Sequence, residues 1–291
     1  MHPRIALPRA AHYNSDDGRP NAAGRRNHFV IKIVSTDFDG TLYAEFDDPP
    51  IPLALQELIG RLQKQGVKWV INTGRDMPGL MHALSRPNIN IQPDYLVLVE
   101  REIHRREDSG YVGHAEWNDA CRRSHEELFI KVRRDLPRLV SWVNSRYNAA
   151  VSEDAYSPFC LTAYSNGDAE AIHQYMDEYC REVPNLKVMR NNVYARFCHA
   201  DYDKGTALSE IARLHKISPR HVFAIGDHLN DLPMLELRHA ACLAAPANAL
   251  DVVKEAVRFR KGFVSPLPAG EGVMDSLNYY LKQPPWTPSG R

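Results

Sequence analysis

The chain has 291 residues, of which 44% are hydrophobic and 25% are charged. It is long enough for roughly two domains with apolar cores, and this composition excludes a mostly disordered chain. Lys plus Arg and Asp plus Glu both total 36, so the formal net charge is zero. Without an overall basic field, the chain is not expected to hold nucleic acid or an anionic membrane, although a local pocket for an anion is compatible with this balance.

The cysteines number five, are widely spaced and form no C-x-x-C pair. This pattern indicates reduced thiols of an intracellular protein rather than a disulfide framework or a zinc site. No apolar run approaches the roughly 20 residues that cross a bilayer, and the amino terminus lacks the apolar segment and cleavage site of a secretory signal. The sequence therefore predicts a soluble, cytoplasmic protein that does not bind membranes.

The first 27 residues are rich in Arg, Asn, Gly and Pro and have no periodic apolar face. Such a segment cannot bury enough apolar surface to order itself, so residues 1–27 are predicted to be a flexible extension. A mitochondrial presequence is the alternative. It is disfavoured because Asp16 and Asp17 interrupt the basic pattern.

Predicted strands and helices alternate along the rest of the chain. The first buried strand is "VIKIVST" (30–36), after which Leu55, Leu58, Ile59 and Leu62 recur with helical spacing before Gly66, in the position that commonly ends a helix. The later elements are a strand at 67–72, a short helix around 80–84, a strand at 94–99, a helix at 206–217, and strands at 221–227 and 241–245 with helices after each. This order predicts an α/β fold with a doubly wound, parallel, Rossmann-like sheet.

Polar side chains stand just past the carboxyl ends of three of these strands: Asp37 and Asp39, Thr73, and Asp227. The "DFDG" stretch alone is also typical of an ordinary surface turn. In a doubly wound sheet, however, the ligand crevice lies beyond the carboxyl ends of the strands. We therefore expect these four polar groups to converge on one rim.

The spacing of these residues locates a second unit. Only 34 positions separate Asp39 from Thr73, but 131 separate Thr73 from Lys204, far more than the remaining core strand needs. We expect a core of residues 28–103 and 201–291 and an inserted α+β unit at 104–200. Within the insert the patterns predict a long helix at 128–143, bent at Pro137, a helix around 172–179, and antiparallel strands at 159–165, 186–190 and 194–199.

Four motifs follow one another in the chain: "DFDGTL", "NTGR", "DKG" and "GDHLNDLPML". In this order they resemble the four motifs of the haloacid dehalogenase superfamily of phosphohydrolases, over residues 29–93 and 203–262. The place of the insert is similar to that of the type IIB caps of the Cof-like and sucrose-phosphate-phosphatase-like branch. Two stretches depart from that branch: "VEREI" stands where relatives commonly have Asn-Gly, and Glu271 where many have Asp.

The resemblance implies roles for the paired carboxylates. Asp37 would be the nucleophile, because a carboxylate can attack phosphorus and form an aspartyl-phosphate. Asp39 would protonate the leaving alcohol and then deprotonate water. Carboxylates beside a phosphate dianion call for a hard divalent cation with oxygen ligands. By the family pattern this is Mg²⁺, held by the carboxylates of Asp37 and Asp227 and the main-chain carbonyl of Asp39, with Asn230 and Asp231 behind them. For those last two residues an ordinary helix N-cap is the alternative.

The phosphoryl group would be bound by the hydroxyl of Thr73, by the main chain around Gly74, and by the charge of Lys204. For Arg75, substrate contact and a structural ion pair are equally compatible with the sequence. Residues of the insert would select the substrate. Candidates that could face the cleft and bond hydroxyl groups are His104, His114, Arg122, Arg123, Tyr164, Asn166 and Arg196.

These assignments predict a Mg²⁺-dependent hydrolase, a monomer or homodimer, that acts on a small phosphomonoester through an aspartyl-phosphate. A sugar phosphate similar to sucrose phosphate is the expected substrate class. A phosphotransferase or phosphomutase would share all four motifs and is one alternative. A catalytically inactive binding module is the other, and it is disfavoured because Asp37, Asp39, Lys204 and Asp227 are all present.

Overall fold

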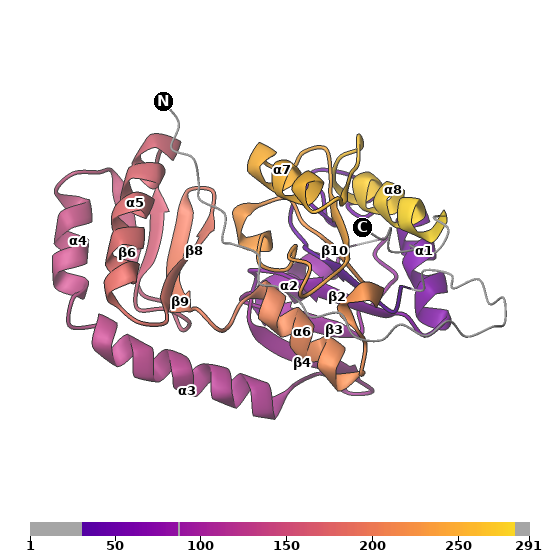
Figure 1. Cartoon of the computed structure of the whole chain (residues 1–291), viewed down its shortest axis with the longest axis horizontal. Helices are drawn as coiled ribbons and strands as arrows, with labels where there is room; N and C mark the ends of the chain where they lie inside the picture. Colours follow the sequence, from indigo (N-terminus) through magenta and orange to yellow (C-terminus); the bar gives the residue numbers. More distant parts are fainter. Residues whose placement is uncertain (1–30, 87, 283–291) are drawn as a thin grey trace, which may run out of the picture.

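The structure is a computed structural model that describes residues 31–86 and 88–282. The predicted flexible extension at 1–27 lies outside these residues. Two sheets organise the described chain, one of eight strands and one of four. Figure 1 shows the larger sheet with α1, α6, α7 and α8 on the right, and the smaller one beside α4 and α5 on the left.

The larger sheet has the order β12-β11-β10-β1-β2-β3-β4-β5. Its six parallel strands are β1 (Ile33–Thr36), β2 (Lys68–Asn72), β3 (Tyr95–Leu98), β10 (Val222–Ile225), β11 (Cys242–Ala245) and β12 (Phe263–Val264). β1 lies at the centre, paired with β10 on one side and β2 on the other. The predicted α/β fold with a doubly wound parallel sheet is confirmed.

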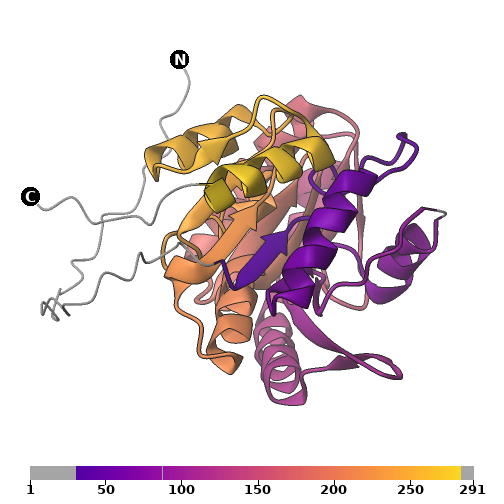
Figure 2. The ribbon, with the colours of Figure 1, turned by 90° about the vertical axis from the view of Figure 1, so that its right-hand side faces the viewer.

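Helices cover both faces of this sheet. On one face α1 (Leu53–Lys64), α2 (Met77–Leu84) and α8 (Ala269–Lys282) enclose an apolar cluster around Trp69. Figure 2 shows α1 in indigo and α8 in yellow side by side on that face. On the other face, α6 (Lys204–Leu214) and α7 (Asp251–Phe259) enclose a second cluster. The short 3-10 turns η1 (Pro219–His221) and η2 (Leu229–Asp231) flank β10.

Two antiparallel strands, β4 (Glu102–Glu107) and β5 (Gly110–Gly113), extend the larger sheet next to β3. Residues 104–113 therefore continue the core sheet, whereas the sequence pattern predicts them to belong to the insert. The pattern conceals this hairpin because Ile103 is the only fully buried side chain in β4, so apolar and polar residues do not alternate.

The smaller unit runs from α3 (Ala115–Val132) to the end of β9. Its antiparallel sheet has the order β6-β7-β9-β8, with β6 at Ala149–Ser152, β7 at Cys160–Ala163, β8 at Leu186–Asn191 and β9 at Tyr194–His199. It packs with α4 (Leu136–Asn144) and α5 (Asn166–Glu182) around a separate apolar core. In Figure 1, α3 runs along the lower edge between the two sheets.

The long helix predicted at 128–143 is two helices, because α3 ends at Val132 and α4 begins at Leu136. Pro137 lies in the first turn of α4, where its missing N–H removes no intrahelical hydrogen bond. The proline thus starts a new helix instead of bending one. No helix of the described residues is long and apolar enough to cross a membrane.

Candidate active site

The predicted polar rim exists as a cavity between the two sheets. Asp37 follows β1, Thr73 follows β2 and Asp227 follows β10, and all three line a cavity of about 250 Å³. They meet there because parallel strands end at the same edge of a sheet. The β8–β9 hairpin of the smaller unit supplies the opposite wall.

A buried lysine links two of the carboxylates at the base of the cavity. Lys204 is fully buried, and its Nζ donates to Asp37 Oδ1 at 2.6 Å and to Asp231 Oδ1 at 2.7 Å. The charges of Asp231 and Asp37 overcome the burial of the ammonium group and raise the pKa of Lys204 above its ordinary value. Lys204 is therefore cationic, and it fixes one oxygen of Asp37.

Asp227 lies beside this group and is held by the loop after β1. Thr41 Oγ1 donates to Asp227 Oδ1 at 2.8 Å. Gly40 has a φ of +75°, and a Cβ at that position would lie 2.8 Å from Asp227 Oδ2. The close approach and the left-handed backbone both require glycine here.

Oxygen atoms of Asp37, Asp227 and Asp231 lie within 4.8 Å of one another. Lys204 pairs with only two of these three carboxylates, Asp37 and Asp231, so the cluster has excess negative charge in a buried place. Burial and repulsion from Asp231 raise the pKa of Asp227 to about 6, and burial likewise raises the pKa of Asp37. Hard oxygen donors in this arrangement fit a divalent cation, which would relieve the repulsion.

Asp231 differs from the other two carboxylates because both of its oxygens already have donors. Oδ1 accepts from Lys204, and Oδ2 accepts from the N–H groups of Asp227 and His228 at 2.9 Å each. This occupancy favours a supporting position for Asp231 over direct ligation. Asn230, predicted beside it, donates through Nδ2 to Glu100 Oε1 at 2.7 Å.

Asp39 lines the same cavity but is not part of the acidic cluster. Its carboxylate is half-exposed and accepts from Arg75 through Nη2 at 2.6 Å and Nε at 2.8 Å. The guanidinium carbon also lies 5.3 Å from the centre of the Phe38 ring. Of the two interpretations of Arg75 that the sequence left open, the structure shows the ion pair, and Arg75 also lines the cavity.

Thr73 and Gly74 form the side of the cavity next to Asp37. The Thr73 side chain is buried, and its Oγ1 accepts from the Arg75 N–H at 3.1 Å, which leaves the hydroxyl hydrogen able to donate. The Gly74 carbonyl accepts from Arg196 Nη2 at 3.2 Å. The structure thus brings together every predicted core site residue, with Asp231, Lys204 and Thr41 behind the lining.

Only one of the seven substrate-binding candidates from the insert reaches the cavity. Arg196 lines it together with Met189, Asn191 and Tyr194. The other six lie elsewhere: His114 pairs with Glu210, Arg122 with Asp119 and Glu126, His104 lies in β4 next to Gly113, and Arg123, Tyr164 and Asn166 are exposed. The residue type alone does not predict whether the side chain faces the cavity, because that depends on its position in the strand or helix.

Glu100 is a cavity residue that sequence reasoning did not single out. Its side chain is buried, lines the cavity and accepts from Asn230. Val99 and Glu100 have φ values of 44° and 68°, an uncommon region for residues other than glycine. The sequence did offer a signal for Glu100: "VEREI" stands where relatives commonly have Asn-Gly, and Asn and Gly both adopt positive φ angles readily.

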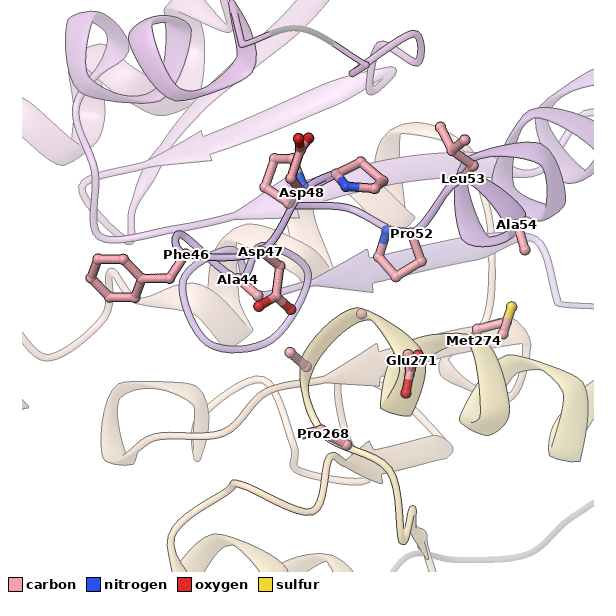
Figure 3. A pocket seen from close by; sticks show the side chains of 14 residues that line it. Ala44, Phe46, Asp47, Asp48, Pro52, Leu53, Ala54, Pro268, Glu271 and Met274 are labelled. Carbon is pink, nitrogen blue, oxygen red and sulfur yellow. The ribbon is translucent and has the colours of Figure 1, made fainter.

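A larger groove of about 810 Å³ lies between the loop after β1 and the start of α8. Figure 3 shows the loop that carries Phe46 and Asp47 opposite the first turn of α8, which carries Glu271. Its lining includes Asp47, Asp48 and Glu271 and no lysine, arginine or histidine. This groove is therefore poorly suited to a phosphorylated ligand.

Comparisons with known proteins agree with this geometry. The family described as haloacid dehalogenase-like hydrolase matches residues 140–275. The candidate phosphatase YxeH of Bacillus subtilis is 23% identical over 79% of this chain and 93% of its own length. The phosphoglycolate phosphatase of Staphylothermus marinus is 23% identical over 88% of this chain and 100% of its own.

Among solved structures, the sucrose-phosphatase of Synechocystis, solved with sucrose and phosphate, superposes with a TM-score of 0.65. It is 15% identical, and the alignment covers 86% of this chain and 98% of that one. This likeness shows a shared fold.

The fold and the cavity define the class of protein: a doubly wound α/β protein with an inserted unit, whose site lies beyond the carboxyl ends of parallel strands and is rich in carboxylates. The family match over residues 140–275 and the phosphatases among the relatives support a phosphatase of the haloacid dehalogenase superfamily, and the shared fold is compatible with type IIB.

Proposed function

We propose that the chain hydrolyses a small phosphomonoester in a Mg²⁺-dependent reaction, with Asp37 as the nucleophile. The observation that carries the proposal is the environment of Asp37: its Oδ1 is held by the buried Lys204 amine, and carboxylates of Asp227 and Asp231 lie close by. Because Lys204 holds Oδ1 of Asp37, a residue that lines the cavity, we assign the attack to the other carboxylate oxygen. That second oxygen can attack phosphorus in line with the leaving group.

Asp39 and Arg75 stand where the leaving group would depart. In the first step Asp37 forms a bond to phosphorus, the bond to the leaving oxygen breaks, and protonated Asp39 gives that oxygen a proton. In the second step the Asp39 carboxylate, the form that pairs with Arg75, takes a proton from water as the water attacks the aspartyl-phosphate. Arg75 would orient Asp39 in both steps.

Asp37, Asp227 and the main-chain oxygen of Asp39 would hold the cation, with Asp231 and Asn230 supporting them. When bound, Mg²⁺ neutralises the transferring phosphoryl oxygens. Thr73, Gly74 and Lys204 would hold the same oxygens from the protein side. The smaller unit, which closes the cavity with β8 and β9, would act as the cap that selects the leaving group.

The sequence predicts a sugar phosphate as substrate. The fold shared with the Synechocystis sucrose-phosphatase is compatible with a sugar phosphate. The cavity, at about 250 Å³, lies at the small end of ligand sites and favours a smaller leaving group than a disaccharide. We therefore propose a leaving group of a few carbon atoms.

The test is an assay of purified protein against p-nitrophenyl phosphate and a panel of phosphorylated metabolites, with Mg²⁺ or with EDTA. We expect turnover that chelation abolishes and added Mg²⁺ restores. Undiminished turnover in EDTA would reject the metal assignment. Adding an acceptor alcohol distinguishes a phosphotransferase, because the released phosphate would then fall below the released alcohol.

A further inference from the structure

Arg196 is the cation that the smaller unit contributes to the cavity. Side chains in a strand alternate between faces, so Tyr194 and Arg196 of β9 point to one side, while Ala195 and Phe197 pack in the core of the smaller unit. Met189 pairs with Arg196 across the β8–β9 ladder and lines the cavity with it. The alternation of side chains along β9 therefore places the Arg196 guanidinium on the cavity side of the strand.

The guanidinium of Arg196 is buried but only partly satisfied. Its side chain is 6% exposed, and its one hydrogen bond among the described residues goes from Nη2 to the Gly74 carbonyl. Nη1 lies 4.0 Å from Asp154 Oδ2, beyond hydrogen-bond distance, and Nε has no partner. Burial disfavours its charge, but Glu100 and Asp154 keep the pKa of Arg196 above its ordinary value. A buried cation with free donors calls for an acceptor.

Two more buried polar atoms without partners belong to the same cavity. They are His228 Nδ1 and Asn230 Oδ1, and both residues line it with Arg196. Native proteins leave few such atoms, and each needs an explanation. Their gathering around one cavity indicates a polar ligand that satisfies them.

The other cationic side chains near the cavity, those of Lys204 and Arg75, are already ion-paired with aspartates. Lys204 is shared between Asp37 and Asp231, and Arg75 is paired with Asp39. The phosphoryl group belongs at Asp37, next to Lys204. Arg196 is thus available to bind a second acidic group of the substrate, on the leaving-group side of the cavity.

We propose that Arg196 binds a carboxylate on the leaving group, so that the substrate is a phosphorylated carboxylic acid of a few carbon atoms. This inference rests on the proposed phosphatase function and names its substrate class. A carboxylate matches the planar fork of arginine. A second phosphoryl group fits less well, because it is bulkier in a 250 Å³ cavity and its higher charge would meet the carboxylates of Glu100 and Asp154.

The test compares 3-phosphoglycerate with glycerol 3-phosphate, which differ only in a carboxylate against a hydroxymethyl group. In the wild-type protein we expect kcat/KM to be about 10- to 100-fold higher for the acid, the range of a charged hydrogen bond. In Arg196→Gln that ratio should approach one. Arg196→Lys should retain part of it, since the charge remains and the fork is lost. Arg122→Gln, on the exposed face of α3, is the matched control and should keep the wild-type ratio.

Three results would overturn the inference. A wild-type ratio near or below one would show that no carboxylate is preferred. Equal losses on both substrates in Arg196→Gln would place Arg196 on the phosphoryl group. Titration calorimetry in EDTA decides the matter even without turnover: wild-type protein that binds 3-phosphoglycerate no more tightly than glycerol 3-phosphate would contradict the inference. Failure to hydrolyse p-nitrophenyl phosphate, by contrast, would count only against the proposed function.

Discussion

At the scale of single residues, the two aspartates of "DFDG" have opposite surroundings although only Phe38 separates them. Asp37 is buried against Lys204, whereas Asp39 is half-exposed against Arg75. A fixed, desolvated carboxylate suits a nucleophile, and one near solvent suits a group that exchanges protons with water. The two positions should therefore respond differently to the same substitution.

Asp37→Asn should abolish turnover and the trapping of a phosphoenzyme, because an amide is a poor nucleophile and a weaker ligand for Mg²⁺. Acid quench with a labelled substrate, followed by measurement of protein-bound phosphate, checks this. Asp47→Asn, in the larger groove, is the control and should behave as wild type. Wild-type turnover in Asp37→Asn would contradict the covalent mechanism.

Asp39→Asn should lower kcat on alkyl phosphates by roughly 10²- to 10⁴-fold, because the leaving alkoxide loses its proton donor. The loss should be smaller for p-nitrophenyl phosphate, whose leaving group needs no proton. Steady-state assays on both substrates measure the difference. Equal losses on the two would argue against Asp39 as the acid.

At the scale of elements, the first turn of α6 presents Lys204 to the site. Asp203 caps this helix: its Oδ1 accepts from the N–H groups of Gly205 and Thr206 at 2.9 and 2.8 Å, and Thr206 Oγ1 accepts from the Asp203 N–H. The Asp203 carboxylate also pairs with Lys187 of β8 at 2.7 Å. Asp203 thus stabilises the first turn of α6, which carries Lys204, and also ties that turn to β8 of the smaller unit.

Asp203→Ala should lower the free energy of unfolding by about 1–2 kcal/mol, the usual cost of losing an N-cap, and should lower kcat as the first turn loosens around Lys204. Asp203→Asn keeps the cap and should be milder in both respects. Urea unfolding followed by circular dichroism gives the stability, and the phosphatase assay gives kcat. A loss of stability without any loss of kcat would show that Lys204 is positioned independently of the cap.

At the scale of the whole molecule, the acidic cluster couples stability to cations. Burial and Asp231 raise the pKa of Asp227 to about 6, well above that of a free aspartate. In the metal-free protein this carboxylate weakens the fold above pH 6, and the penalty is relieved as the pH falls and Asp227 takes up a proton. A bound cation should relieve the same penalty at neutral pH.

Mg²⁺ should therefore raise the melting temperature at pH 7.5, by an amount that corresponds to about 2.7 kcal/mol when its concentration is a hundredfold above the dissociation constant. The shift should shrink at pH 5, where protons compete for Asp227. Differential scanning fluorimetry across this pH range measures it. A shift that is as large at pH 5, or that persists in Asp227→Asn, would contradict the assigned ligands.

Much of the core could be predicted because its patterns are local. Leu55, Leu58, Ile59 and Leu62 mark α1 by spacing alone, and the structure has that helix with all four side chains buried. The buried strands read as continuous apolar runs, since both faces of the parallel sheet are covered. From the strand ends it followed that Asp37, Thr73 and Asp227 should meet, because parallel strands bring their carboxyl ends to one edge.

Only the tertiary structure decided the rest, because it depends on contacts between distant segments. The β4–β5 hairpin is hidden in the sequence because its side chains are mostly exposed and its pairing with β3 is made by the backbone. Arg75 turns to Asp39, which is 36 residues away. Glu100 lines the cavity from a backbone with a positive φ, which is uncommon for this residue type. Arg196 lines it because the alternation of side chains along β9 places it on the cavity side. The polar residues of the site thus stand in short sequence motifs, whereas the cavity around them exists only where the larger sheet meets the β8–β9 hairpin of the smaller unit.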